Sequence, residues 1–95
     1  MSAYLIYDVD IHQPGPYGQF MDQVKPLVET FGGRYLARGG AHEVLEGKWQ
    51  PTRIVLFEFP DMDAARKLFN SEEYAPLKTL RQSCSTGSVV IVEGL

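Results

Sequence analysis

Two strand-length segments of this sequence are apolar on both of the faces that a strand presents. In residues 53–59 (RIVLFEF), alternate positions place Ile, Leu and Glu on one face and Val, Phe and Phe on the other. In residues 88–93 (SVVIVE), both faces are again built mainly from valine and isoleucine. An antiparallel sheet with one face in water alternates apolar and polar residues. We therefore expect a sheet that is covered on both faces.

The remaining periodic segments predict the order β-α-β-β-α-β in one domain covering residues 1–95. In chain order we first expect a strand at Tyr4–Val9 and an amphipathic helix from Pro16 to Phe31. A strand at Arg34–Arg38 should follow and continue at His42–Glu46 after a bulge or bend at Gly39–Gly40. The strand at 53–59, helical segments that start at Asp61 and Ser71, and a strand at Val89–Val92 complete the order. With right-handed crossovers this is an α+β, ferredoxin-like fold, whose antiparallel sheet has its first and third strands in the centre.

The two helical layers of such a subunit cover only one face of its sheet. A chain of 95 residues also buries a thin core. A second copy packed sheet against sheet is the simplest cover for the other apolar face. The sequence thus predicts a homodimer in which two sheets form a barrel-like sandwich, a dimeric α+β barrel.

Composition narrows the function classes further. Cys84 is the only cysteine, which rules out an internal disulfide and a cysteine metal cage and fits a reducing cytoplasm. The net charge of −3 argues against a general nucleic-acid binder, and no apolar run is long enough to span a bilayer. Two histidines 30 positions apart give little sign of a metal site, so we expect no cofactor.

Charged residues inside the apolar strands are the candidates for chemistry. Asp8 and Glu58 have the same parity as apolar neighbours in their strands, so they are expected on one face near the same end of the sheet. If the second strand pairs with the third around the WQPT loop, His42 falls beside Leu56 and joins them in one pocket, together with Arg38. Such a group could transfer protons, with Glu58, Asp8 and His42 as acid–base candidates.

Structural roles compete with these catalytic ones. Asp8 could cap a helix or turn near a strand end, and His42 could be a surface or interface histidine. Glu58 could form an inter-strand or inter-subunit ion pair with Arg53, Arg38 or Arg81.

For substrate binding the candidates are Arg38, as a clamp for an anion, and Arg53, Tyr74 and Trp49. The hydroxyl of Tyr74 could point into the cleft between helices and sheet, or its ring could be core. Trp49 could cover a pocket or pack across the dimer. The paired glycines match no phosphate-binding fingerprint, so backbone bending is their expected role.

Three segments together resemble one family: GGRYLARGG, EVLEGKWQPTRIVLFEFP, and NSEEYAPL with Arg81. The combination is similar to the small bacterial proteins called domain of unknown function thirteen-thirty, over nearly the whole chain. That family looks like a branch of the dimeric α+β barrel superfamily, so the resemblance implies the same fold and a dimer but no reaction. The superfamily includes cofactor-free monooxygenases, lactone isomerases, haem-degrading enzymes and stress-related proteins, and a fold alone does not select among these functions.

Three functions remain open from the sequence. The first is a cofactor-independent enzyme of oxygenase, isomerase or lyase type that acts on a small, partly apolar molecule. The second is a non-catalytic dimer that binds a small ligand or serves in a stress response. The third is a purely structural or interaction module.

Overall fold

The helices and strands follow the order expected from the sequence. The computed structural model describes all of residues 1–95 and contains β1 (Ala3–Ile11), α1 (Pro14–Thr30), β2 (Arg34–Arg38), β3 (Ile54–Phe59), α2 (Met62–Phe69), α3 (Ala75–Cys84) and β4 (Ser85–Glu93). Asp61 caps α2 as predicted, because its Oδ1 accepts from the N–H of Ala64 at 2.8 Å. None of the three helices has the length and apolar character needed to cross a membrane.

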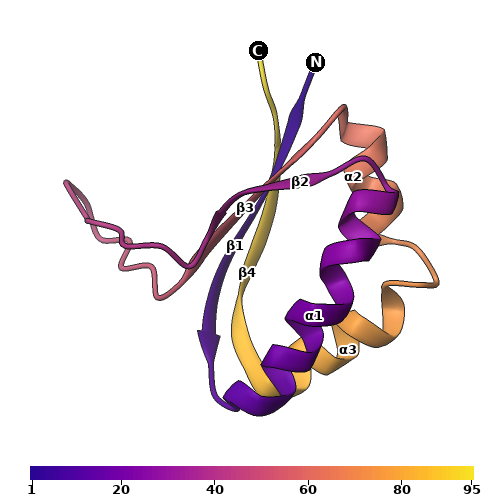
Figure 1. The fold of residues 1–95 in the computed structure, drawn as a ribbon. Coiled ribbons are helices and arrows are strands. Elements are labelled where there is room, and N and C mark those ends of the chain that lie inside the picture. Colours follow the sequence, from indigo (N-terminus) through magenta and orange to yellow (C-terminus); the bar gives the residue numbers. More distant parts are fainter.

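The four strands form one antiparallel sheet in the order β2-β3-β1-β4, with the first and third strands in the centre. Leu5 of β1 lies between Phe57 of β3 and Ile91 of β4. All three helices pack on the same face of the sheet (Figure 1). This is the predicted α+β, ferredoxin-like fold.

The core lies between the sheet and the helices because alternate strand positions point toward them. Val55, Phe57 and Phe59 of β3 are buried there. The predicted stripe of α1 supplies Tyr17, Phe20, Val24 and Val28 from the other side, all buried. Each such side chain contributes about 1.5–3 kcal/mol by leaving water.

The opposite face of the sheet, which we call the open face, has no element packed on it. It carries the exposed side chains of Val90 and Val92, which are 55% and 46% accessible, and the half-buried side chains of Ile6 and Leu56. The sequence predicted apolar residues on both faces of the sheet, and within a single chain the helices cover only one of these faces.

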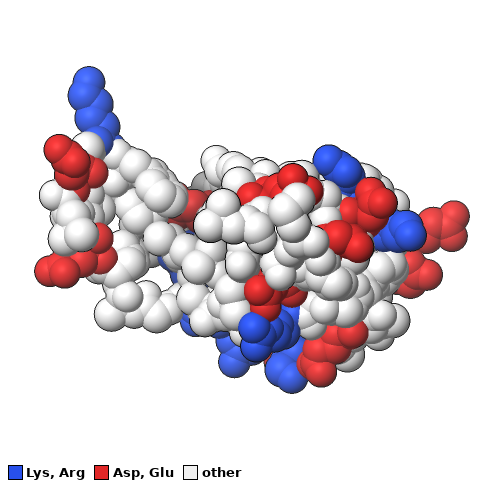
Figure 2. Space-filling model, turned by 90° about the horizontal axis from the view of Figure 1, so that it is seen from above, with Lys and Arg blue, Asp and Glu red and all other residues white.

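Residues 39–53 correct one expectation. The segment His42–Glu46 does not continue β2 as a strand, and residues 41–50 are all exposed. Gly39 ends β2 with a φ of +68°, and β3 begins only at Ile54, so no neighbouring strand is left for the segment to pair with. Residues 39–53, called the arm from here on, instead project from the body as a long loop (Figure 1) with charged residues at its tip (Figure 2).

The bulge lies earlier than the sequence suggested. The pairing of β2 with β3 shifts between Tyr35 and Ala37, not at Gly39–Gly40. Tyr35 pairs with Phe57, while Ala37 pairs with Leu56, so Leu36 is the extra residue. A bulge of this kind changes which face each later side chain points to.

Candidate functional site

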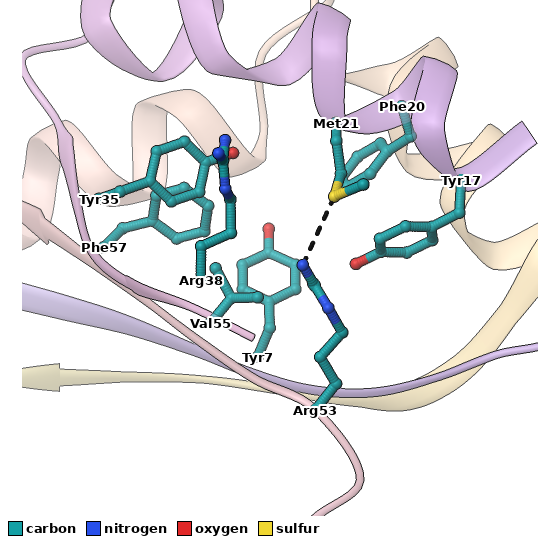
Figure 3. Close-up of a pocket in the computed structure, with 9 residues that line it drawn as sticks. All are labelled: Tyr7, Tyr17, Phe20, Met21, Tyr35, Arg38, Arg53, Val55 and Phe57. Atoms are coloured by element: carbon teal, nitrogen blue, oxygen red, sulfur yellow. Dashed lines mark hydrogen bonds between the residues drawn. The ribbon is translucent and has the colours of Figure 1, made fainter. Parts of the chain in front are cut away.

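A cavity opens between α1 and the sheet, on the helix-covered face. Its volume is about 10 Å³ with the side chains as they lie, so a ligand larger than water has to displace them, and it is lined by Tyr7, Tyr17, Phe20, Met21, Tyr35, Arg38, Arg53, Val55 and Phe57. Figure 3 shows these side chains converging from α1 on one side and from the strands on the other. The lining is mostly aromatic and aliphatic, with two arginines, and contains no aspartate, glutamate or histidine. It has the composition of a site for a small, partly apolar molecule.

The sequence places the apolar lining through simple periodicity. Tyr7 and Val55 are direct partners in neighbouring strands, so their side chains share the helix-covered face. The rings of Tyr35 and Phe57 lie 4.5 Å apart, and those of Tyr7 and Phe57 meet edge to face at 5.5 Å. Burial raises the pKa of the hydroxyls of Tyr7, Tyr17 and Tyr35, so they stay protonated at neutral pH and can donate hydrogen bonds.

Arg53 enters the cavity from the residue just before β3. Its Cζ lies 5.7 Å from the centre of the Tyr17 ring, and its Nη2 lies 3.6 Å from the sulfur of Met21 (Figure 3). Its Nη1 is buried and has no hydrogen-bond partner. A Cβ on Gly39 would lie only 2.6 Å from Nε of Arg53. The glycine therefore lets the guanidinium pack directly against the backbone.

Arg38 reaches the same cavity because of the bulge. Without the register shift its side chain would share the open face with Arg34, whereas in the structure it pairs with Val55, whose side chain points into the cavity. The Cζ of Arg38 lies 5.1 Å from the centre of the Tyr35 ring. Since its side chain is largely exposed, Arg38 lies at the mouth of the cavity.

A buried polar group lies behind Tyr7. The hydroxyls of Tyr7 and Tyr74 are 2.8 Å apart and share a hydrogen bond. The Cζ of Arg81 lies 5.2 Å from the centre of the Tyr7 ring, and Arg81 is only 5% accessible. The hydroxyl of Tyr74 therefore points into the helix–sheet interior, while its ring belongs to the core.

Asp8 lies on the open face and holds the base of the arm. Its Oδ2 accepts from the indole N–H of Trp49 at 2.9 Å, and its Oδ1 accepts from the backbone N–H of Thr52 at 2.9 Å. Desolvation alone would raise the pKa of Asp8, but these hydrogen bonds together lower it. The arrangement matches the cap of a turn that the sequence left as an alternative.

His42 and Trp49 belong to the arm rather than to the helix–sheet cavity. The Nε2 of His42 is 2.9 Å from the carbonyl oxygen of Pro51. Trp49 is 60% accessible and lies with His42 beside a shallow hollow formed by the arm itself.

Glu58 forms an ion pair between strands. Its Oε1 lies 2.6 Å from Nη2 and 2.8 Å from Nε of Arg34, its partner across β2 and β3. The hydrogen bond from Arg34 lowers the pKa of Glu58. An ion pair was one of the sequence alternatives, but its arginine is one that the sequence did not single out.

The expected pocket of Asp8, Glu58, His42 and Arg38 is not assembled in the chain. Asp8 and Glu58 do share a face, but they lie at opposite ends of it, since Asp8 pairs with Ile54 and Glu58 with Tyr4. Leu56 pairs with Ala37 rather than with His42. The prediction used parity correctly but misplaced the register, because β1 and β3 run antiparallel. No group of three or more histidine, cysteine or acidic side chains that could hold a metal comes together either.

Sequence reasoning missed Arg81 as a residue of the cleft. Its signal was present, since Tyr74, Leu77, Arg81 and Cys84 follow one another at helical spacing and are all buried. An arginine in the apolar stripe of a helix is unusual unless a partner compensates its charge. Tyr7 was also overlooked, although it alternates with the buried Leu5 and Val9.

A comparison with models of protein families identifies the family of the chain. The family model called Domain of unknown function (DUF1330) matches residues 2–95. The chain belongs to this family. The resemblance seen in its glycine, tryptophan and arginine segments is thereby confirmed. No curated protein gives a significant match.

Solved structures with little sequence identity share the fold of this DUF1330 chain. A protein of unknown function from Rhodopseudomonas palustris, RPA0582, superimposes with a TM-score of 0.80 at 15% identity, covering 99% of this chain and 82% of that one. SnoaB from Streptomyces nogalater, described as a cofactor-independent oxygenase, gives 0.69 at 14% identity, covering 99% and 93%. Rv0793 from Mycobacterium tuberculosis gives 0.60 at 13% identity, covering 100% and 96%. At these identities the likeness establishes a shared fold and nothing more.

Proposed function

We propose that this protein is a small cofactor-independent enzyme that takes a small, partly apolar molecule into the cavity between α1 and the sheet. The observation that carries the proposal is the cavity lining, in which aromatic side chains surround arginines that have no carboxylate partner. Neutral hydroxyl groups and guanidinium groups in a water-poor cleft stabilise negative charge that develops on a substrate. The described activity of SnoaB supports an oxygenase as the first reaction to test.

The chemistry available in the cavity is stabilisation of an anion rather than proton removal by a carboxylate or histidine. Arg38, Arg53 and the buried hydroxyls of Tyr7 and Tyr74 would hold an oxyanion of the substrate. We propose structural roles for Asp8 in the arm and for Glu58 in the sheet. Proton loss would then have to come from a substrate that is itself acidic.

A homodimer is part of the proposal. The open face carries Val90 and Val92 at 55% and 46% accessibility, and Leu36 at 46% lies on the outer strand. A second copy packed face to face would remove these side chains from water. The exposed Trp49 of the arm would gain a contact surface in the same step. A single buried thiol, Cys84, and the absence of a disulfide support a cytoplasmic location.

The dimer is tested by sedimentation of Val90→Lys. Because Val90 is exposed in the single chain, the variant should fold normally but shift from dimer to monomer at micromolar concentration. Gln82→Lys adds the same charge on the exposed surface of α3 and should leave the mass unchanged. A wild-type protein that sediments as a monomer would contradict the proposed dimer.

A non-catalytic ligand-binding dimer is the second candidate. The absence of any histidine or carboxylate from the cavity lining favours it over an enzyme with acid–base catalysis.

One experiment separates these functions. A panel of small aromatic and aliphatic compounds is screened by thermal shift, and each hit is then incubated in air without added cofactor while oxygen uptake and product formation are followed. The enzyme is supported if Arg53→Gln abolishes turnover and Arg34→Gln preserves it. Arg34→Gln is the matched control, because Arg34 is an arginine of the same sheet that pairs with Glu58 and points away from the cavity. Binding without turnover supports the second candidate. Absence of any compound bound in the cavity argues for the structural module and against both.

A further inference from the structure

Arg81 is a buried cation without a partner. It lies on the inward face of α3, is 5% accessible, and its guanidinium makes no hydrogen bond to any other residue. Its Nε is fully enclosed and unpaired. A buried charge that is neither paired nor hydrogen-bonded costs several kcal/mol. Such an arrangement persists in a folded protein when the charge has a use that the free chain does not display.

Arg53 repeats the pattern a short distance away. Its Nη1 is also buried and unpaired, and its other contacts are the sulfur of Met21 and the ring of Tyr17. The Cζ of Arg53 lies 5.7 Å from the centre of the Tyr17 ring and that of Arg81 lies 5.2 Å from the centre of the Tyr7 ring, and both tyrosines line the cavity. Two guanidinium groups without an ion-pair partner therefore lie around the cavity, Arg53 in its lining and Arg81 against the ring of Tyr7.

No acidic side chain of the chain is available to neutralise this pair. The three ion pairs are Lys25 with Glu29, Arg34 with Glu58, and Asp63 with Arg66, and all lie outside the cavity. Asp8, the acidic residue nearest to Arg53 in the sheet, accepts from the backbone N–H of Arg53 on the open face. No ion pair within the chain therefore supplies a negative charge to Arg53 or Arg81.

The tyrosine pair supplies a neutral donor at the same place. Whichever hydroxyl of Tyr7 and Tyr74 donates in their 2.8 Å hydrogen bond, the other keeps a free O–H. Tyr7 and Arg53 both line the cavity (Figure 3). Arg81 lies against the Tyr7 ring, 5.2 Å from its centre, and is not part of the lining, so it acts through Tyr7.

We infer that the natural ligand is an organic anion with a planar apolar body, whose carboxylate or enolate-type oxygen binds between Arg53 and the hydroxyl of Tyr7. Tyr17, Tyr35 and Phe57 hold the planar part, and Arg81 is a positioning residue that sets the charge behind Tyr7. This inference names the substrate class for the proposed function and rests on the same cavity.

The test compares planar carboxylates with their neutral amides. Benzoate, phenylacetate and cinnamate are each titrated against the corresponding amide by calorimetry, and the methyl resonance of Met21 reports whether the compound enters the cavity. The carboxylates should bind at least about tenfold more tightly than the amides, because a charge-assisted hydrogen bond replaces a neutral one. The preference should weaken in Arg53→Gln and Tyr7→Phe, and should remain in Arg34→Gln.

Arg81 needs a measurement that a purely structural role would not change. In Arg81→Gln the preference for carboxylate over amide should fall while amide binding stays constant, and Arg81→Lys, which restores the charge, should recover part of it. Equal affinity for acid and amide in the wild type would overturn the inference but leave the proposed apolar cavity intact. If neither series moves the Met21 resonance, the inference and the proposed function both fail.

Discussion

Arg81→Met isolates the energetic cost of an unpartnered charge. The methionine keeps most of the aliphatic volume of the arginine stem but removes the buried guanidinium. Replacing a buried ion pair by apolar residues of similar size is often neutral or stabilises a protein by about 1–4 kcal/mol, and a lone guanidinium has no attraction to a partner for the replacement to remove. The contact at 5.2 Å with the Tyr7 ring is lost, which costs about 0.5–2 kcal/mol. The balance is an expected gain of about 1 kcal/mol in the free energy of unfolding.

For a domain of this size, that gain corresponds to a rise of about 4–8 °C in the melting temperature. Thermal and urea denaturation of the ligand-free protein, followed by circular dichroism, measure it. Arg34→Met is the control, because an exposed ion pair contributes only about 0–1 kcal/mol and its loss should not stabilise the protein. The same Arg81 variant should lose the extra stabilisation by benzoate. A loss of about 1 kcal/mol or more in the free energy of unfolding of Arg81→Met would exceed measurement scatter of about 0.5 kcal/mol. It would show that the guanidinium already has stabilising partners in the free protein, and it would refute the reasoning.

Three further predictions concern the surroundings of the cavity. Gly39→Ala should lower the free energy of unfolding by about 1–2 kcal/mol, since φ is +68° at this residue. It should also weaken benzoate binding, because the new methyl group displaces Arg53. An unchanged affinity for benzoate, measured by calorimetry, would contradict the packing argument. The pKa of Asp8 is lowered in the folded protein, so its stabilisation of the arm is complete at neutral pH and is lost as the pH falls below about 3.9 through the folded-state pKa. Fluorescence of Trp49, the only tryptophan, should follow that loss in the wild type and show it already at pH 7 in Asp8→Asn. Glu58→Gln should leave benzoate binding and turnover unchanged, and a large loss of turnover would restore Glu58 as an acid–base candidate.

The fold could be predicted because it depends on local periodicity and short connections. Alternating residues predict β3, a stripe of apolar residues at helical spacing predicts α1, and the N-cap at Asp61 predicts the start of α2. Together these elements leave few possible topologies. The candidate site could be predicted only in part. Arg53 and Tyr74 were named, but Glu58 was placed beside Asp8 because parity gives a face and does not give the position along an antiparallel pair.

The errors in β2 have a different cause. A paired glycine is the visible signal of a bend, so the bulge was placed at Gly39–Gly40. The actual shift occurs at Leu36, whose side chain gives no sign of it, because a bulge is set by how two strands fit each other. The arm likewise has strand-like residues but no strand to pair with.

The extra residue in β2 lets one short strand serve two surfaces. Ala37 pairs with Leu56 on the side of the open face, while Tyr35 and Arg38 both line the cavity. Deleting Leu36 would restore a regular ladder and leave Arg38 opposite Val55, so it would remove only an exposed apolar side chain from the open face, where a second copy is proposed to pack. That single-residue deletion would then weaken subunit association and spare ligand capture, so the bulge gives the open face one more apolar contact without moving the cavity residues.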